Sequence, residues 1–188
     1  MALSRNEILT AAIDILNTDS LNKLSMRGLA SKLNVKAPSL YFHIKDKNEL
    51  LEQISELISS RILRQVKALS TPTITDTLVI FRQELLKINE SPSVFQLTRP
   101  FTPRRVALIQ LFMQQLAQYP IPESQLSAVG NLLNNFTLSF VADEQIFTQT
   151  VAVELSPAAE FTMPIDMANP EKTFRYELNI ILRGISAN

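Results

Sequence analysis

The sequence predicts an all-α protein in two parts: three short helices that include a helix-turn-helix at residues 1–47, and a larger helical domain at residues 48–188. Apolar residues recur at helical spacing along most of the chain. Residues typical of helix starts precede those segments. The composition agrees, because 188 residues with 46% hydrophobic content and only three glycines suit packed helices rather than disorder or a glycine-rich β fold.

The first 50 residues divide into short helices with recognisable ends. Ser4 and Glu7 are spaced as a capping box, and Ser25 is placed to cap a second helix. Asn34 falls where the chain must reverse, and Pro38 suits the first turn of a third helix. Two helices joined by a short turn indicate a helix-turn-helix, although a corner of an ordinary helical bundle has the same pattern.

The rest of the chain is divided by prolines. A capping box at Asp46 and Glu49 predicts a long helix to about Leu69, and we expect this helix to be the only connection between the two domains. Thr102 and Asn169 are predicted N-caps. Segment 148–169 contains two prolines and no helical period, which predicts a mobile or functional loop. Further helices are expected at 74–90, 93–99, 103–118, 122–146 and 170–185.

Charge is distributed unevenly although the net charge is zero. Residues 1–47 carry seven Lys/Arg and four Asp/Glu, whereas residues 48–188 carry eleven and fourteen. The positive sign of the N-terminal part is the one a phosphate-binding surface requires. The chain has no cysteine, which excludes disulfides and thiolate metal sites, and it shows neither a signal peptide nor a membrane-spanning apolar run. A cytoplasmic protein is expected.

The third helix carries the residues that favour DNA binding. Leu40 and Ile44 should face the small core, while Tyr41 and His43 can donate hydrogen bonds to phosphates. The alternative is that Tyr41 and Phe42 only cover that core. The predicted DNA-binding residues are Arg27, Ala37, Pro38, Ser39, Tyr41, Phe42, His43 and Lys47.

The stretch LNVKAPSLYFHIKDKNELL resembles the DNA-binding signature of the tetracycline-repressor (TetR) family. In that signature a helix-turn-helix ends in Leu-Tyr-x-His and is followed by a Lys-x-x-Leu-Leu helix start. The resemblance spans roughly residues 5–52. It implies a homodimeric, ligand-responsive transcriptional repressor that binds a pseudo-palindromic operator. Residues 1–47 would be its helix-turn-helix DNA-binding domain, and residues 48–188 its α-helical effector-binding and dimerisation domain. Ala37 stands where the tetracycline repressors carry an amide that reads a base, so a different operator is expected.

C-terminal stretches resemble the tetracycline-repressor subgroup of this family: LTRP at 97–100, LSAVGNLLNNFTLSFVADEQ at 126–145 and FRYELNIILRGI at 174–185. This resemblance implies an effector pocket in which leucines and a phenylalanine replace imidazoles and an amide. The expected effector is therefore an apolar small molecule, bound without a metal or cofactor. The alternative is that these residues simply fill a core. The positions that correspond to the pocket are Leu63, Thr77, Phe81, Phe95, Thr98, Arg99, Leu111 and Asp143.

The last two predicted helices are more apolar than one buried side requires. The resemblance implies that they form a four-helix interface between two subunits, and a twofold axis is what a palindromic site requires. Charges at Phe140 and Leu178 are expected to separate the subunits.

Two other classes of protein fit the sequence less well. An enzyme is disfavoured because the chain has one histidine and no cysteine, and because adjacent carboxylates at Asp143 and Glu144 point about 100° apart on a helix. A helical small-molecule sensor or adaptor without DNA binding would not need Tyr41, His43 and the lysines beside them.

Overall fold

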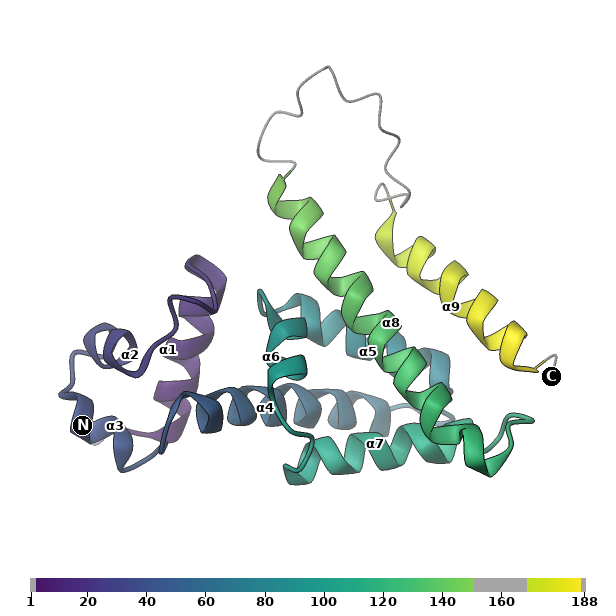
Figure 1. Cartoon of the computed structure of the whole chain (residues 1–188), viewed down its shortest axis with the longest axis horizontal. Coiled ribbons are helices and arrows are strands. Elements are labelled where there is room, and N and C mark those ends of the chain that lie inside the picture. The colour runs from purple at the N-terminus through teal and green to yellow at the C-terminus, as the bar shows by residue number, and fades with distance from the viewer. Residues whose placement is uncertain (1–2, 151–168, 187–188) are drawn as a thin grey trace, which may run out of the picture. The chain divides into compact units, whose positions relative to one another are not determined.

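The computed structural model describes residues 3–150 and 169–186, which form nine α-helices and no strand (Figure 1). This confirms the all-α prediction. Residues 151–168 of the predicted loop lie outside the described residues. The helices are α1 Arg5–Thr18, α2 Met26–Lys32, α3 Ala37–Tyr41, α4 Lys47–Lys67, α5 Ile74–Leu86, α6 Ser91–Leu97, α7 Pro103–Leu116, α8 Glu123–Thr150 and α9 Pro170–Ser186.

The chain forms two compact units. The first unit comprises residues 1–64 and 84–108, and the second comprises residues 65–83 and 109–188. Each unit draws on two separate stretches of sequence, because the boundaries between the units fall within α4, α5 and α7. The predicted boundary after residue 47 separates two proposed functions rather than two compact units, and it stays a prediction.

The start of the first unit follows its sequence signals. The backbone N–H of Ser4 donates to Glu7 Oε2 at 2.8 Å, and the Glu7 N–H donates to Ser4 Oγ at 3.2 Å, so the capping box is confirmed. Ser25 caps α2 by accepting from the Gly28 N–H at 3.1 Å. Leu40 and Ile44 are fully buried, and each such side chain contributes about 1.5–3 kcal/mol to folding.

The start of α4 differs slightly from the prediction. Asp46 accepts from the Glu49 N–H at 2.9 Å, as a cap should. The Glu49 carboxylate accepts from the Lys45 N–H at 2.7 Å rather than from that of Asp46. Glu49 therefore satisfies a backbone donor one residue earlier than in a standard capping box.

Helix ends in the middle of the chain were predicted less well. Helix α5 ends at Leu86 rather than residue 90, and α6 begins at Ser91. Between them Glu90, the N-cap of α6, adopts a left-handed conformation with φ 56°, which directs the chain into that helix. Asn169 is confirmed as a cap, since its Oδ1 accepts from the Lys172 N–H at 3.1 Å.

Thr102 is not the side-chain cap of α7. Its buried Oγ1 has no hydrogen-bond partner within the described part of the chain. The carboxylate of Glu56 on α4 takes its place, accepting from the Arg104 N–H at 2.8 Å and the Arg105 N–H at 3.4 Å. A carboxylate is favoured there because it satisfies unpaired amides at the positive end of the helix dipole.

The second unit contains an aromatic cluster on α8 and α9, which run side by side (Figure 1). Phe174 is fully buried, stacked on Phe136 at 5.2 Å and edge-on to Phe140 at 5.1 Å between ring centroids. Arg82 of α5 lies 5.8 Å from the Phe140 centroid and 5.7 Å from that of Phe174. Its guanidinium forms a bidentate pair with Glu144, with N–O distances of 2.9 and 2.6 Å. This buried ion pair joins α5 to α8.

None of the described helices combines the length and the hydropathy that a bilayer span requires.

Candidate nucleic-acid interface

The turn between α2 and α3 fixes the direction of the third helix. Asn34 is left-handed with φ 52°, as its sequence position predicted. The Asn34 N–H donates to Ser31 O at 3.1 Å and the Val35 N–H donates to Ala30 O at 3.0 Å. This is the hydrogen-bond pattern of a Schellman motif, which closes the end of α2 and turns the chain towards α3.

Helix α3 buries one side chain and exposes its aromatics. Leu40 is inaccessible, whereas Tyr41 is 54% exposed and Phe42 is 88% exposed. The two rings therefore do not cover the small core, and the alternative that they serve only as packing is wrong. Large exposed aromatics next to each other are unusual on a surface that binds nothing.

All eight predicted DNA-binding residues are at least partly accessible in the first unit. Arg27 and Pro38 are exposed like the two aromatics, and the remaining four are half-buried: Ala37, Ser39, His43 and Lys47. Their accessibility is compatible with contact to a nucleic acid, while the contacts themselves stay a prediction.

Two cations donate to backbone carbonyls of the helix-turn-helix region, one just after α3 and the other between α1 and α2. Arg5, which the sequence analysis did not identify, donates from a guanidinium NH2 to the His43 carbonyl at 2.8 Å and lies 3.8 Å from Glu49. Lys47 donates from Nζ to the Leu21 carbonyl at 2.8 Å. An ammonium has three donors, so Lys47 keeps two for a phosphate. A basic residue in the first turn of α1 was the only sequence signal for Arg5.

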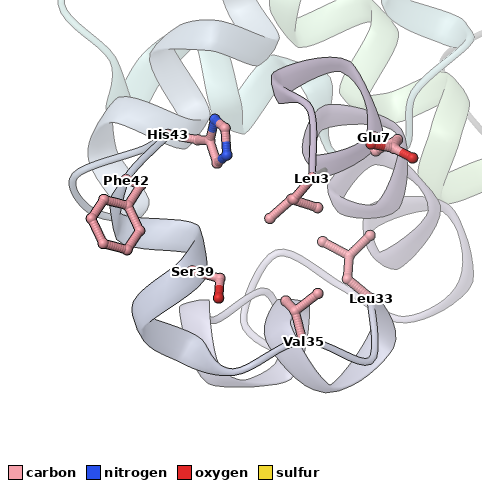
Figure 2. Close-up of a pocket in the computed structure, with 7 residues that line it drawn as sticks. All are labelled: Leu3, Glu7, Leu33, Val35, Ser39, Phe42 and His43. Atoms are coloured by element: carbon pink, nitrogen blue, oxygen red, sulfur yellow. The ribbon is translucent and has the colours of Figure 1, made fainter. Parts of the chain in front are cut away.

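A hollow of about 530 Å³ lies against this helix (Figure 2). Figure 2 shows that its side chains come from the segment leading into α1, from α1 itself, from the end of α2 and its turn, and from α3 and the residues after it. Leu3, Leu33 and Val35 supply apolar surface, and Ser39, Phe42 and His43 are among its other lining residues. The surface next to the predicted DNA contacts is therefore concave, with both polar and apolar lining.

Helix α4 is not the only link between the helix-turn-helix and the rest of the first unit. The Asn89 N–H donates to Asn17 Oδ1 at 2.8 Å, and the Asn89 amide donates to Asn17 O at 3.1 Å. The Leu21 N–H donates to Glu90 Oε1 at 2.8 Å. The prediction of a single connection was wrong, because hydrogen bonds also join the residues before α6 to the end of α1 and the segment after it.

The predicted effector positions are divided between the two units. In the first unit Phe95 and Thr98 are buried, Leu63 is half-buried and Arg99 is exposed. In the second unit Thr77 and Phe81 are buried, Leu111 is half-buried and Asp143 is exposed. Phe81 packs against Phe112 with 6.0 Å between ring centroids. A common binding site for these eight residues stays a prediction.

The first unit contains a buried arginine that the sequence analysis missed. Arg105 of α7 is only 9% exposed, and its guanidinium lies 4.3 Å from the Phe95 ring centroid. It donates to Thr98 Oγ1 at 2.9 Å and to the Phe95 carbonyl at 3.5 Å. Burial lowers the pKa of Arg105 to about 10, so the group remains charged at neutral pH. One arginine of the adjacent pair Arg104–Arg105 is exposed and the other buried, and no sequence pattern separates them.

A helix-turn-helix with an exposed, aromatic and cation-flanked third helix defines the class of helix-turn-helix DNA-binding proteins. Residues 8–54 match the family model described as bacterial regulatory proteins, tetR family. A transcriptional regulator of the helix-turn-helix type from Saccharopolyspora erythraea is 26% identical over 77% of this chain and 62% of its own length. The class D tetracycline repressor protein from Escherichia coli is 24% identical over 97% of this chain and 88% of its own length.

Solved structures agree on the fold. BioQ from Mycobacterium smegmatis superposes with a TM-score of 0.80 at 21% identity, covering 98% of both chains. ActR from Streptomyces coelicolor, in complex with actinorhodin, gives 0.73 at 22% identity over 100% of this chain and 98% of its own. BioQ with its double-stranded DNA operator gives 0.72 at 19% identity over 99% of both chains. Residues 8–54 therefore resemble the tetR family of bacterial regulatory proteins, and the chain resembles a tetracycline repressor protein along 97% of its length.

Proposed function

We propose that this protein is a transcriptional repressor whose residues 1–47 bind a pseudo-palindromic operator and whose residues 48–188 bind an effector and form a homodimer. One observation carries the proposal: α3 exposes Tyr41 and Phe42 next to His43, in an orientation held by the Schellman turn and by Arg5. A relative of the same fold crystallised with its DNA operator supports it.

A gel shift with DNA from upstream of the protein's own gene tests the proposal. A specific complex that resists excess unrelated DNA is expected, and footprinting should reveal two half-sites about one helical turn, roughly 34 Å, apart. A protein that binds no DNA more tightly than random sequence would instead be a helical sensor or adaptor.

Exposed apolar side chains on α8 and α9 support the dimer. Leu132 and Ile146 are exposed about four helical turns apart on α8, and Tyr176 and Ile180 are exposed one turn apart on α9. Apolar residues aligned along two neighbouring helices are typical of a protein interface. The predicted test positions need correction: Phe140 and Leu178 are 4% and 0% exposed, so they belong to the core of the subunit. Charges there would unfold the subunit rather than separate two subunits.

The effector is an apolar small molecule that binds without a metal. Leucines at positions 63 and 111 and a phenylalanine at 95 offer no ligand to a magnesium ion. A complex of ActR, a protein of the same fold, with actinorhodin supports a small-molecule effector in general. Calorimetry with a panel of hydrophobic compounds, with and without magnesium, tests this proposal. Tight, magnesium-dependent binding of tetracycline would contradict it.

The effector releases DNA by favouring a different spacing of the two DNA-binding domains. It can shift that equilibrium only by its difference in affinity for the two states. Helix α4 and the polar contacts from Asn89 and Glu90 to the end of α1 are the connections through which this shift reaches the helix-turn-helix. Asn89→Ala should therefore reduce the effect of ligand on DNA affinity while leaving ligand binding itself unchanged.

A further inference from the structure

Arg105 differs from the other buried arginine of the described chain, because it is buried without a counter-ion. Arg82 is neutralised by Glu144 through two charge-assisted hydrogen bonds. No carboxylate within the described residues forms an ion pair with Arg105, and its polar contacts are the hydroxyl of Thr98 and the carbonyl of Phe95. The nearby carboxylate of Glu56 is bound to backbone amides at the start of α7.

A buried charge without an ion partner is costly to a folded protein. The stacked ring of Phe95 offsets part of that cost, since a guanidinium over an aromatic face is attracted by the ring. The two hydrogen bonds use two of the five guanidinium donors. Arg105 thus keeps both a net positive charge and donors that the described residues do not engage.

A second polar group at the start of α7 also lacks a partner. Thr102 immediately precedes α7 and lies three residues before Arg105. The Thr102 Oγ1 is buried and has no hydrogen-bond partner among the residues described. A hydroxyl without a partner and a guanidinium without a counter-ion are both donors that suit a carboxylate or another oxyanion.

The geometry points to an anionic effector: an aromatic or apolar molecule whose carboxylate, sulfonate or phenolate group binds Arg105 beside Phe95, Thr98 and Thr102. This inference rests on the proposed small-molecule function and defines its ligand class more narrowly. Arg105 supplies the charge and a planar fork for two oxygen atoms, Thr102 supplies a hydroxyl donor, and Phe95 supplies apolar contact. An isosteric ligand without the negative charge would leave the buried guanidinium unpaired and bind more weakly.

Two fluorescent compounds that differ only in a sulfonate test the inference. 8-Anilinonaphthalene-1-sulfonate carries the anion, and N-phenyl-1-naphthylamine has the same rings without it. The full-length wild-type protein should bind the sulfonate at least about tenfold more tightly than the neutral compound, a difference typical of one charge-assisted contact. In Arg105→Met that preference should disappear while affinity for the neutral compound is retained. Arg105→Lys should preserve part of the preference, because lysine keeps the positive charge but lacks the planar guanidinium that binds two oxygen atoms at once.

The neighbouring Arg104→Met is the matched control, since Arg104 is exposed and should leave both affinities unchanged. Thermal unfolding separates a ligand-binding role from a structural one. If Arg105 serves to bind an anion, the Arg105→Met variant should melt at or above the wild-type temperature. In that variant an apolar side chain replaces a charge without a counter-ion. A melting temperature lower by more than about 5 °C would assign Arg105 to holding α6 against α7.

Equal wild-type affinity for the two compounds, binding of neither, or a sulfonate preference that survives in Arg105→Met overturns the inference. These titrations contain no DNA, so their failure is distinguishable from failure of the proposed repressor function. A protein that binds its operator but shows no anion preference disproves only the anionic effector. One that prefers the sulfonate but binds no operator disproves only the repressor.

Discussion

Two pairs of aromatic residues, one in each unit, differ sharply in how much of each side chain is exposed. Phe140 and Phe174 of the second unit are 4% and 0% exposed and surround the ion pair of Arg82. Tyr41 and Phe42 of the first unit are 54% and 88% exposed, although a small hydrophobic core lies directly beneath α3. The first pair contributes to stability through burial, whereas the second pair contributes less and leaves most of its surface available to a partner.

The largest expected effect is on stability. Phe174→Ala should lower the free energy of unfolding by about 3–5 kcal/mol, because it removes buried ring contacts and leaves a cavity. Phe42→Ala should change it by less than about 0.5 kcal/mol, as for other exposed substitutions. Urea unfolding at several protein concentrations measures both, since dimerisation adds to apparent stability. Comparable losses in the two variants would mean that Phe42 is buried in solution.

The next largest effect on stability is expected at the buried ion pair between Arg82 and Glu144. Glu144→Gln should cost about 1–3 kcal/mol, because it leaves the buried Arg82 guanidinium with a weaker, neutral partner. Asp143→Asn is the matched control, as Asp143 is the exposed neighbour on the same helix. Thermal or chemical unfolding of both variants checks this difference. Equal stability of the two variants would show that the pair contributes nothing.

A smaller effect is expected on assembly. Leu132→Asp combined with Ile180→Asp should weaken the dimer by about 1–3 kcal/mol while the monomer stays folded, because both side chains are exposed within the subunit. Sedimentation velocity at micromolar concentration distinguishes monomer from dimer. Asn131→Asp, at an exposed polar position on α8, is the control. Wild-type protein that sediments as a monomer would contradict the proposed homodimer.

The smallest effect concerns pH and the start of α5, where Thr73 and Asp76 form a capping box that the sequence analysis missed. Hydrogen bonds from the Thr73 side chain and backbone lower the pKa of Asp76. A carboxylate with a lowered folded-state pKa stabilises the fold above its unfolded pKa of about 3.9, and that stability is lost as pH falls through the folded value. Asp76→Asn should reduce the acid sensitivity of unfolding between about pH 5 and 2, with a loss at pH 7 of about 1 kcal/mol or less. An unchanged pH profile would contradict the assignment.

The features that sequence predicted well are local. Capping at Ser4, Ser25 and Asn169, the left-handed Asn34, and the inward-facing Leu40 and Ile44 follow from residue type and spacing within one or two turns. Accessibility at the predicted DNA-binding positions also followed from the helical period of α3.

The features that sequence missed depend on partners distant in the chain. Glu56 caps a helix 48 residues later, and Arg82 pairs with a carboxylate 62 residues away. The burial of Arg105 but not Arg104 depends on how α7 packs against α6, which adjacent identical residues cannot reveal. Periodicity also selected Phe140 and Leu178 as interface residues, because an apolar residue facing the subunit core has the same spacing as one facing a partner.

The salt dependence of operator binding tests the central claim most directly, namely that the exposed end of α3 contacts DNA. Fluorescence anisotropy with a labelled operator should give a log–log slope that falls by about 0.9 for each phosphate interaction that Tyr41→Ala or His43→Ala removes. Tyr41→Phe, which keeps the ring and removes the hydroxyl, should lower the slope as much as Tyr41→Ala, whereas Arg27→Ala or Ser39→Ala should change preference among operator sequences. Unfolding free energies should stay close to wild type throughout. A double variant of Tyr41 and His43 that binds the operator normally at physiological salt would contradict the assignment of α3 as the recognition helix.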